Sequence, residues 1–193
     1  MIFDRSAFYM KLDILAIGVH PDDVELGCAG TLLKHIELGY KVGILDLTKG
    51  ELGTRGTAFT RKQEAEDAAN ILGVALRENL GFEDGFFNDD KHHQIQLIQV
   101  IRKYRPEIIF TNAKHDRHPD HGKAAALTNA AVFLSGLPKI ETTLNGVLQE
   151  AFRPKSLYNY IQAIHIEPDF VVDITPYFDK KMEAVLAYKT QFH

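Results

Sequence analysis

Short apolar segments alternate with amphipathic segments along the chain. Residues 12–19 (LDILAIGV) form a nearly continuous apolar run, which is typical of a strand buried on both faces. Residues 24–38 carry apolar positions at helical spacing and end before Gly39, which favours a helix that stops there. The same pattern predicts further strands at 41–47, 75–80, 107–110, 156–161 and 170–174.

Helical segments stand between these strands. Thr60 and Gln63 have the spacing of a capping box, which would open a helix that Gly73 closes. Further helices are predicted at 90–104, at 119–134 and from 176 to the end of the chain. The repeated order of strand and helix predicts parallel βαβ units with right-handed crossovers. The expected fold is therefore a single α/β domain with a Rossmann-like, doubly wound, mainly parallel sheet.

Composition narrows the class of protein. The 193 residues are 45% hydrophobic and 25% charged, which is ordinary for a globular domain. A formal net charge of −4 lacks the basic footprint of a nucleic-acid-binding protein. No apolar run approaches the ~20 residues of a membrane-spanning helix. A single cysteine, Cys28, excludes a disulfide framework and fits a reducing compartment, so a cytoplasmic protein without membrane or nucleic-acid partners is expected.

Both ends of the chain carry expectations of their own. The start, MIFDRSAFYM, lacks the apolar stretch and cleavage site of a signal peptide. Residues 1–9 are predicted to be a loose arm or an addition to the natural protein, because Met10 offers a second start just before the first strand. At the other end, a helical pattern still runs at His193, so the domain at 10–193 is expected to continue in the natural protein.

Two similar motifs follow the first and the fourth predicted strands. They read His20-Pro21-Asp22-Asp23 and His118-Pro119-Asp120-His121. Ligands of open α/β sheets bind beyond the carboxyl ends of the strands, so the two motifs are expected to meet at one edge. Three His or carboxylate ligands and an open position are typical of catalytic zinc, which lowers the pKa of bound water to about 7. The paired acids Asp22 and Asp23 would supply one ligand and one general base.

Structural explanations compete with each of these assignments. Asp22 and Glu25 have the spacing of a helix N-cap and its capping-box partner. His121 taken alone is typical of an exposed first-turn histidine, and Arg55 of a solvated loop charge. No GxGxxG, GxxxxGK[ST] or GxSxG sequence occurs, which argues against dinucleotide-binding, P-loop and serine-hydrolase proteins.

The motifs HPDDVELGCAGTL and HPDH, in this order and after these strands, resemble the LmbE-like (PIG-L) family of zinc-dependent N-acetylglucosamine deacetylases. The resemblance extends from about residue 12 to residue 192. The segments TKGELGTRGT and AYKTQF further resemble the branch that deacetylates N-acetylglucosaminyl malate in bacillithiol biosynthesis. The resemblance implies an amino-sugar substrate and a homo-oligomer.

The resemblance also implies roles for individual residues. His20, Asp23 and His121 match the family's metal ligands, and Asp22 matches its general base. The remaining matches are His118 as the residue that stabilises the oxyanion, Asp120 as the residue that holds the His118 ring, and Arg55 and Arg117 as binders of a substrate carboxylate.

Other functions stay open at this point. Zinc and Fe²⁺ accept the same ligands, and two histidines with one carboxylate also describe non-haem iron oxygenases. The fold could instead serve as a non-catalytic sugar- or metal-binding module, although simple binding requires neither Asp22 nor His118. Within the family, chitooligosaccharides or mycothiol-like conjugates are alternative substrates.

Overall fold

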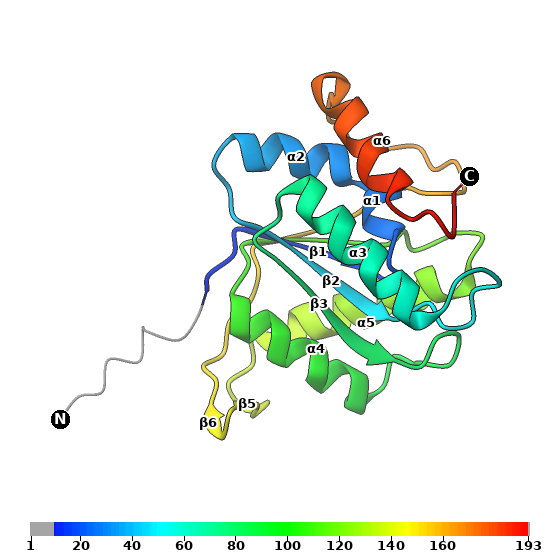
Figure 1. Cartoon of the computed structure of the whole chain (residues 1–193). Helices are drawn as coiled ribbons and strands as arrows, with labels where there is room; N and C mark the ends of the chain where they lie inside the picture. Colours follow the sequence, from blue (N-terminus) through cyan, green and yellow to red (C-terminus); the bar gives the residue numbers. More distant parts are fainter. Residues whose placement is uncertain (1–9, 193) are drawn as a thin grey trace.

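A computed structural model describes residues 10–192, so the predicted arm at 1–9 and the terminal His193 lie outside the described residues. A five-stranded parallel sheet forms the centre, in the order β3-β2-β1-β4-β7. Figure 1 shows β1, β2 and β3 of this sheet side by side. Its strands are β1 Ile14–Gly18, β2 Val42–Thr48, β3 Leu76–Phe82, β4 Ile108–Thr111 and β7 Ser156–Asn159. The expected doubly wound, mainly parallel sheet is thereby confirmed.

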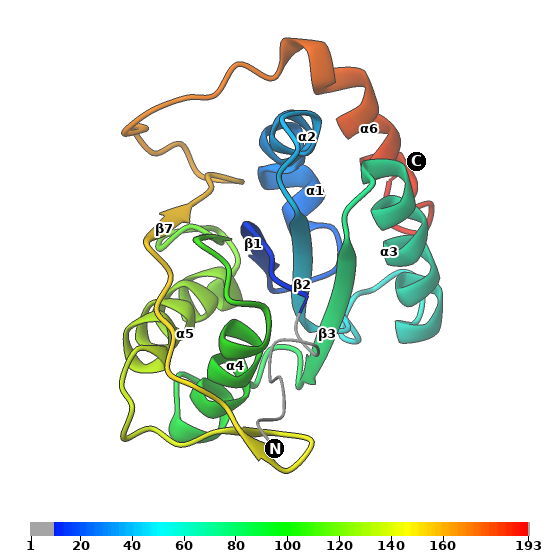
Figure 2. The same cartoon turned by 90° about the vertical axis from the view of Figure 1, so that its left-hand side faces the viewer.

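Helices cover both faces of this sheet, as the 90° view shows (Figure 2). One face carries α1 Asp23–Gly27, α2 Ala29–Glu37, α3 Ala58–Leu72 and α6 Phe178–Leu186, and the other carries α4 Lys91–Tyr104 and α5 Pro119–Ser135. All residues of β1 and β2 are buried, which explains their nearly unbroken apolar sequence. A small hairpin, β5 Thr143–Leu144 with β6 Val147–Leu148, follows α5. Among the described residues, no helix is long and apolar enough to cross a membrane.

The strand order places a topological switch point beside β1. The chain moves from β1 to β2 and β3 on one side, and β4 then pairs with the other side of β1. The loops that follow β1 and β4 therefore leave the sheet next to one another in opposite directions. Crevices of this kind are the usual ligand sites of open α/β sheets.

Two predicted helices differ from the structure near their first turns. The helix predicted at 24–38 is divided into α1 and α2 at Cys28, whose φ is −139°. Gly27, just before this break, lies against the Tyr160 ring, where a Cβ would stand 2.3 Å from Cδ2. The capping box of α3 is formed by Thr57 and Thr60 rather than by Thr60 and Gln63, because Thr57 occupies the N-cap and Thr60 the third helical position.

The C-terminal third differs more. The strand predicted at 170–174 does not form: Phe170 and Val171 are exposed, and no described strand pairs with the outer edge of β7. The helix predicted from 176 to the end is a 3₁₀ turn, Thr175–Tyr177, followed by α6, which ends at Leu186. Beyond it, Thr190 bonds the Glu64 carboxylate through its N–H at 2.7 Å and its Oγ1 at 2.8 Å. This contact with α3 directs the chain away from a continued helix.

A buried network of charged side chains joins β3, β2 and α1. Arg77 of β3 donates to both oxygens of Asp46 on β2, at 2.7 and 2.8 Å, and also to Glu25 of α1. Tyr188 donates to the same Glu25 oxygen at 3.1 Å. The side chains of Arg77, Asp46 and Glu25 are at most 7% exposed, so each charge depends on the others for its stability in the interior.

We predict that Arg77→Ala destabilises the fold strongly, because it leaves two buried carboxylates without their cation. The expected loss is about 3–5 kcal/mol of unfolding free energy, measured by urea denaturation. Lys155→Ala is the matched control, since Lys155 forms an exposed ion pair with Glu107; its unfolding midpoint should equal that of the unchanged chain. Equal midpoints for both variants would contradict a stabilising role of the network.

Candidate metal-dependent active site

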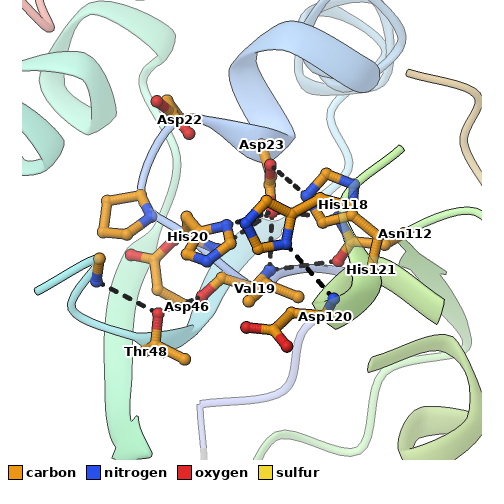
Figure 3. Close-up of polar contacts among 12 residues, drawn as sticks. Val19, His20, Asp22, Asp23, Asp46, Thr48, Asn112, His118, Asp120 and His121 are labelled. Carbon is orange, nitrogen blue, oxygen red and sulfur yellow. Dashed lines mark hydrogen bonds and ion pairs between the residues drawn. The ribbon is translucent and has the colours of Figure 1, made fainter. Parts of the chain in front are cut away.

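Asp23 lies where β1 ends and α1 begins, and its carboxylate is fixed from several sides. Its Oδ2 accepts the backbone N–H groups of Val19 and His20, each at 3.0 Å. The same oxygen accepts the side-chain amide of Asn112, the residue after β4, also at 3.0 Å. These three bonds orient Asp23 toward the crevice between β1 and β4 (Figure 3). They also join the ends of the two strands.

Asp22 occupies the N-cap position of α1 but does not act as a cap. Its side chain accepts no capping hydrogen bond, and Glu25 is engaged by Arg77, so the capping-box explanation fails. Its φ of 129° is a strained conformation for a residue with a Cβ. Arg61 of α3 donates to the Pro21 carbonyl at 2.6 Å and to Asp22 Oδ2 at 3.3 Å. Burial and the Asp23 charge raise the pKa of Asp22 to about 7, against the influence of Arg61.

The second motif forms the start of α5. His118 is the N-cap, and its Nδ1 accepts the backbone N–H of Asp120 at 3.3 Å. Pro119 takes the first helical position, where its missing N–H leaves no bond unmade. His121 follows within the first turn, on the side that faces β1. The sequence His-Pro-Asp-His is thus a helix start that aims two imidazoles into the crevice.

The two motifs converge in space. A nitrogen from each of His20, His118 and His121 lies within 4.8 Å of the others. Asp23 Oδ1 lies 3.2 Å from His121 Nε2, and Asp23 Oδ2 lies 3.7 Å from His20 Nδ1. Ligand bonds of about 2.0–2.2 Å in a tetrahedral zinc site place neighbouring ligand atoms about 3.3–3.6 Å apart. The three histidine nitrogens therefore form a group that could hold one divalent cation, and each Asp23 oxygen lies close to one of the histidines.

Neighbouring charges shift the pKa values of the cluster. Burial opposes both shifts, but the contact with Asp84 raises the pKa of His20 and the contact with Asp23 raises that of His121. Against its own burial, Asp23 has a lowered pKa because His121 donates to it and the His20 charge is close. Burial and the charges of His20 and His121 lower the pKa of His118. The surroundings therefore raise the pKa of His20 and His121 and lower the pKa of His118.

Asp120 differs from the sequence-based expectation. The bond to the His118 ring comes from the backbone N–H of Asp120, because His118 serves as the helix N-cap. The Asp120 carboxylate, whose side chain is 1% exposed, instead accepts the N–H of Gly85 at 2.9 Å and lies 2.9 Å from the Lys123 ammonium. Asp120 therefore ties the loop after β3 to α5 and does not hold the imidazole through its carboxylate.

Several polar residues of the candidate site were not predicted from the sequence. Asp84, from the loop after β3, lies 2.9 Å from His20 Nε2 and accepts the N–H of Leu52 at 3.0 Å. Gln162, beyond β7, donates to Asp23 Oδ1 at 3.0 Å, and Asp116 lies 3.2 Å from His121 Nδ1. All three residues follow the carboxyl end of a strand, which is the one feature of the sequence that could have indicated them. This feature does not show which polar residue of a polar loop reaches the site.

The two arginines expected to bind a substrate carboxylate lie in exposed loops. Arg55 is in the loop between β2 and α3, where its carbonyl accepts Gln191 Nε2 at 2.9 Å. Arg117 immediately precedes His118 and is exposed. Within residues 10–192, no hydrogen bond or ion pair joins either guanidinium to the histidine cluster.

The fold is an α/β sheet whose switch point brings the two histidine-containing motifs together as a candidate metal site. The sequence matches the family model described as "PIG-L: GlcNAc-PI de-N-acetylase" over residues 15–132, and the chain belongs to this family. Members of the family are metal-dependent N-deacetylases, so the protein is an enzyme of this class that acts on conjugates of N-acetylglucosamine.

The relatives that resemble this chain include named deacetylases and one hydratase. The chain is 32% identical to diacetylchitobiose deacetylase of Thermococcus kodakarensis, over 93% of this chain and 70% of that one. It is 28% identical to a probable N-acetyl-alpha-D-glucosaminyl L-malate deacetylase 2 of Bacillus cereus, over 94% and 84%. It is also 26% identical to 4-oxalmesaconate hydratase of Pseudomonas putida, over 93% and 74%. The crystal structure of the conserved protein TT1542 from Thermus thermophilus superposes with a TM-score of 0.87 at 43% identity, covering 94% and 80%.

Proposed function

We propose that the protein removes the N-acetyl group of N-acetylglucosaminyl malate, with Zn²⁺ bound by His20, Asp23 and His121. The convergence of these side chains at one crevice carries the proposal. The two deacetylase relatives, one of a chitobiose derivative and one of a malate glycoside, support an acetylated glucosamine as the reacting unit. The TKGELGTRGT segment favours the malate conjugate.

The donor set fits a borderline divalent cation, with two imidazoles and one carboxylate. When bound, such a cation supplies a water of lowered pKa and polarises the acetamide carbonyl. Fe²⁺ accepts the same donors, so the native ion depends on which metal is available as well as on the ligands. The buried, hydrogen-bonded carboxylate of Asp23 would keep its orientation when the cation enters, because its Oδ2 is held by Val19, His20 and Asn112.

Asp22 is the proposed general base. It neighbours a ligand, and its carboxylate oxygen would accept the proton of the attacking water and later deliver it to the leaving amide nitrogen. Arg61, whose guanidinium touches both the Pro21 carbonyl and Asp22, would hold this carboxylate in place during both transfers. A base that is not itself a ligand remains free to accept the proton.

His118 is the proposed stabiliser of the oxyanion. Its Nδ1 is occupied by the N–H of Asp120, so Nε2 is the nitrogen left to donate to the developing negative charge. Its ring centroid lies 4.7 Å from that of His20 and 5.2 Å from that of His121, beside the proposed metal position. Donors held in place before the reaction contribute strongly to catalysis, because they need no reorganisation.

Arg55 and Arg117 are the proposed contacts for the malate carboxylates. Both are exposed, Arg55 in the loop after β2 and Arg117 in the loop after β4. An aglycone that extends outward from the sugar would meet them there. A guanidinium can bind a carboxylate through two parallel hydrogen bonds.

The proposal predicts metal-dependent acetate release. The purified chain should release acetate from N-acetylglucosaminyl malate faster than from N-acetylglucosamine or diacetylchitobiose, and a chelator should abolish release until zinc is restored. Activity should persist without oxygen, which an iron oxygenase would require. Preference for diacetylchitobiose would assign a chitooligosaccharide substrate instead. No release from any of the three would contradict the deacetylase and favour a binding module or the hydratase chemistry of the Pseudomonas relative.

Asp22→Asn should lower kcat for acetate release by about 10²–10⁴-fold, because the amide cannot accept the proton of water. Elemental analysis should still find zinc in this variant, since Asp22 is not a proposed ligand, whereas His121→Ala should lose the metal. Asp169→Asn, at an exposed position, is the matched control and should retain full activity. A normal kcat in Asp22→Asn would remove Asp22 from the role of base.

Arg55→Ala should raise KM for the malate glycoside by about tenfold or more, since a charge-assisted hydrogen bond contributes about 1.5–3 kcal/mol. The KM for neutral diacetylchitobiose should stay the same, because this substrate has no carboxylate. Arg117→Ala provides the comparison for the second loop. Equal effects on charged and neutral substrates would argue against a carboxylate contact at Arg55.

A further inference from the structure

The two ring nitrogens of His121 face different carboxylates. Nε2 lies 3.2 Å from Asp23 Oδ1, and Nδ1 lies 3.2 Å from Asp116 Oδ2. Nδ1 is buried and forms no aligned hydrogen bond within the described residues, so this contact with Asp116 is its polar partner. A neutral imidazole that binds a metal through one nitrogen carries its proton on the other. The structure thus distinguishes an inward from an outward nitrogen.

Asp116 is itself held firmly. Its side chain is 1% exposed. Oδ1 accepts the N–H of Arg117, and Oδ2 lies 3.4 Å from the N–H of Ala163. Asp116 does not cap α5, because His118 occupies the N-cap. A buried carboxylate is destabilising unless it is paired, and the imidazole of His121 is a side-chain partner of this one in addition to the two backbone N–H groups.

We propose that Asp116 is a positioning residue that binds the Nδ1–H of His121 and so directs Nε2 to the metal. This inference rests on the proposed function, in which His121 is a ligand. Carboxylates that hold the outer nitrogen of a ligating histidine fix its tautomer and ring orientation and make it a stronger ligand. Asp84 stands in a corresponding relation to His20, since it contacts Nε2 at 2.9 Å while Nδ1 faces Asp23.

The same arrangement connects the metal ligands to the chain beyond β7. Gln162 donates to Asp23 Oδ1 and accepts from Asn112 at 2.8 Å, and the next residue, Ala163, faces Asp116. Gln162 thus contacts the proposed ligand Asp23 and its partner Asn112, and Ala163 contacts Asp116, the partner of His121. Both residues lie outside the 15–132 range of the family model. The geometry of the site depends on this segment as well as on the two His-Pro-Asp motifs.

Zinc affinity of the purified full chain tests the proposal. Asp116→Ala should raise the zinc dissociation constant by about 10–100-fold, measured by competition with a chromophoric chelator. Asp116→Asn, which keeps the shape and loses the charge, should show a smaller increase and covers the case in which the alanine variant does not fold. Circular dichroism of the metal-free variants checks that both are folded.

Asp90→Ala is the matched control, because Asp90 Oδ1 contacts His93 Nδ1 at 2.9 Å at the start of α4, outside the cluster. Its zinc dissociation constant should equal that of the unchanged chain. His121→Ala keeps two proposed ligands and should bind zinc only weakly. In this background Asp116→Ala should not lower the residual affinity further, since the two residues act through one imidazole. An additional loss there, or unchanged affinity in the single Asp116→Ala and Asp116→Asn variants, would overturn the positioning role.

A spectroscopic measurement identifies the ligating nitrogen directly. With ¹¹³Cd in place of zinc and ¹⁵N-labelled histidine, the unchanged chain should show cadmium coupling at Nε2 of His121. Coupling at Nδ1 would overturn the inference while leaving His121 a ligand. If the unchanged chain binds neither zinc nor cadmium, the proposed function fails, and the positioning role fails with it.

Discussion

The arrangement of the site depends on the contacts of the Asp23 carboxylate. This carboxylate is buried, and burying a charge is strongly unfavourable unless donors surround it. Its donors come from the end of β1, from Asn112 after β4, from Gln162 after β7 and from His121 in α5. One side chain thus brings four segments to the switch point, and their convergence follows from the need to satisfy its two oxygens.

The sequence predicts the sheet well because its central strands are buried on both faces. Such strands must be apolar throughout, as β1 and β2 are, and this pattern is visible without any knowledge of their partners. Residues 170–174 show where the reasoning stops. They carry a strand-like sequence, but a strand also needs a neighbouring strand with free backbone groups in register, and Phe170 and Val171 lie exposed instead. The end of α6 depends in the same way on a distant contact, between Thr190 and Glu64.

The candidate site shows the same division between local and distant information. The two His-Pro-Asp motifs are recognisable in the sequence because each places its histidines and aspartates within four consecutive residues, directly after a predicted strand. Gln162 is 139 positions from the carboxylate it contacts, and Asp84 is 64 positions from His20. A glutamine or aspartate in a polar loop is unremarkable until the fold brings it to the site. Asp120 adds a further case: its backbone N–H donates to the His118 ring, whereas its carboxylate accepts from Gly85.

The backbone at Asp22 explains how two adjacent acids can take different positions. Pro21 is held by Arg61 through its carbonyl, and Asp23 is held through its carboxylate by backbone N–H groups. With both neighbours fixed, Asp22 is left with a φ of 129°, a conformation that destabilises a non-glycine residue by about 1–3 kcal/mol. The surrounding contacts offset this strain, and the resulting turn directs Asp23 into the crevice and Asp22 toward Arg61. A glycine would relieve the strain at position 22, but it would remove the carboxylate that Arg61 contacts.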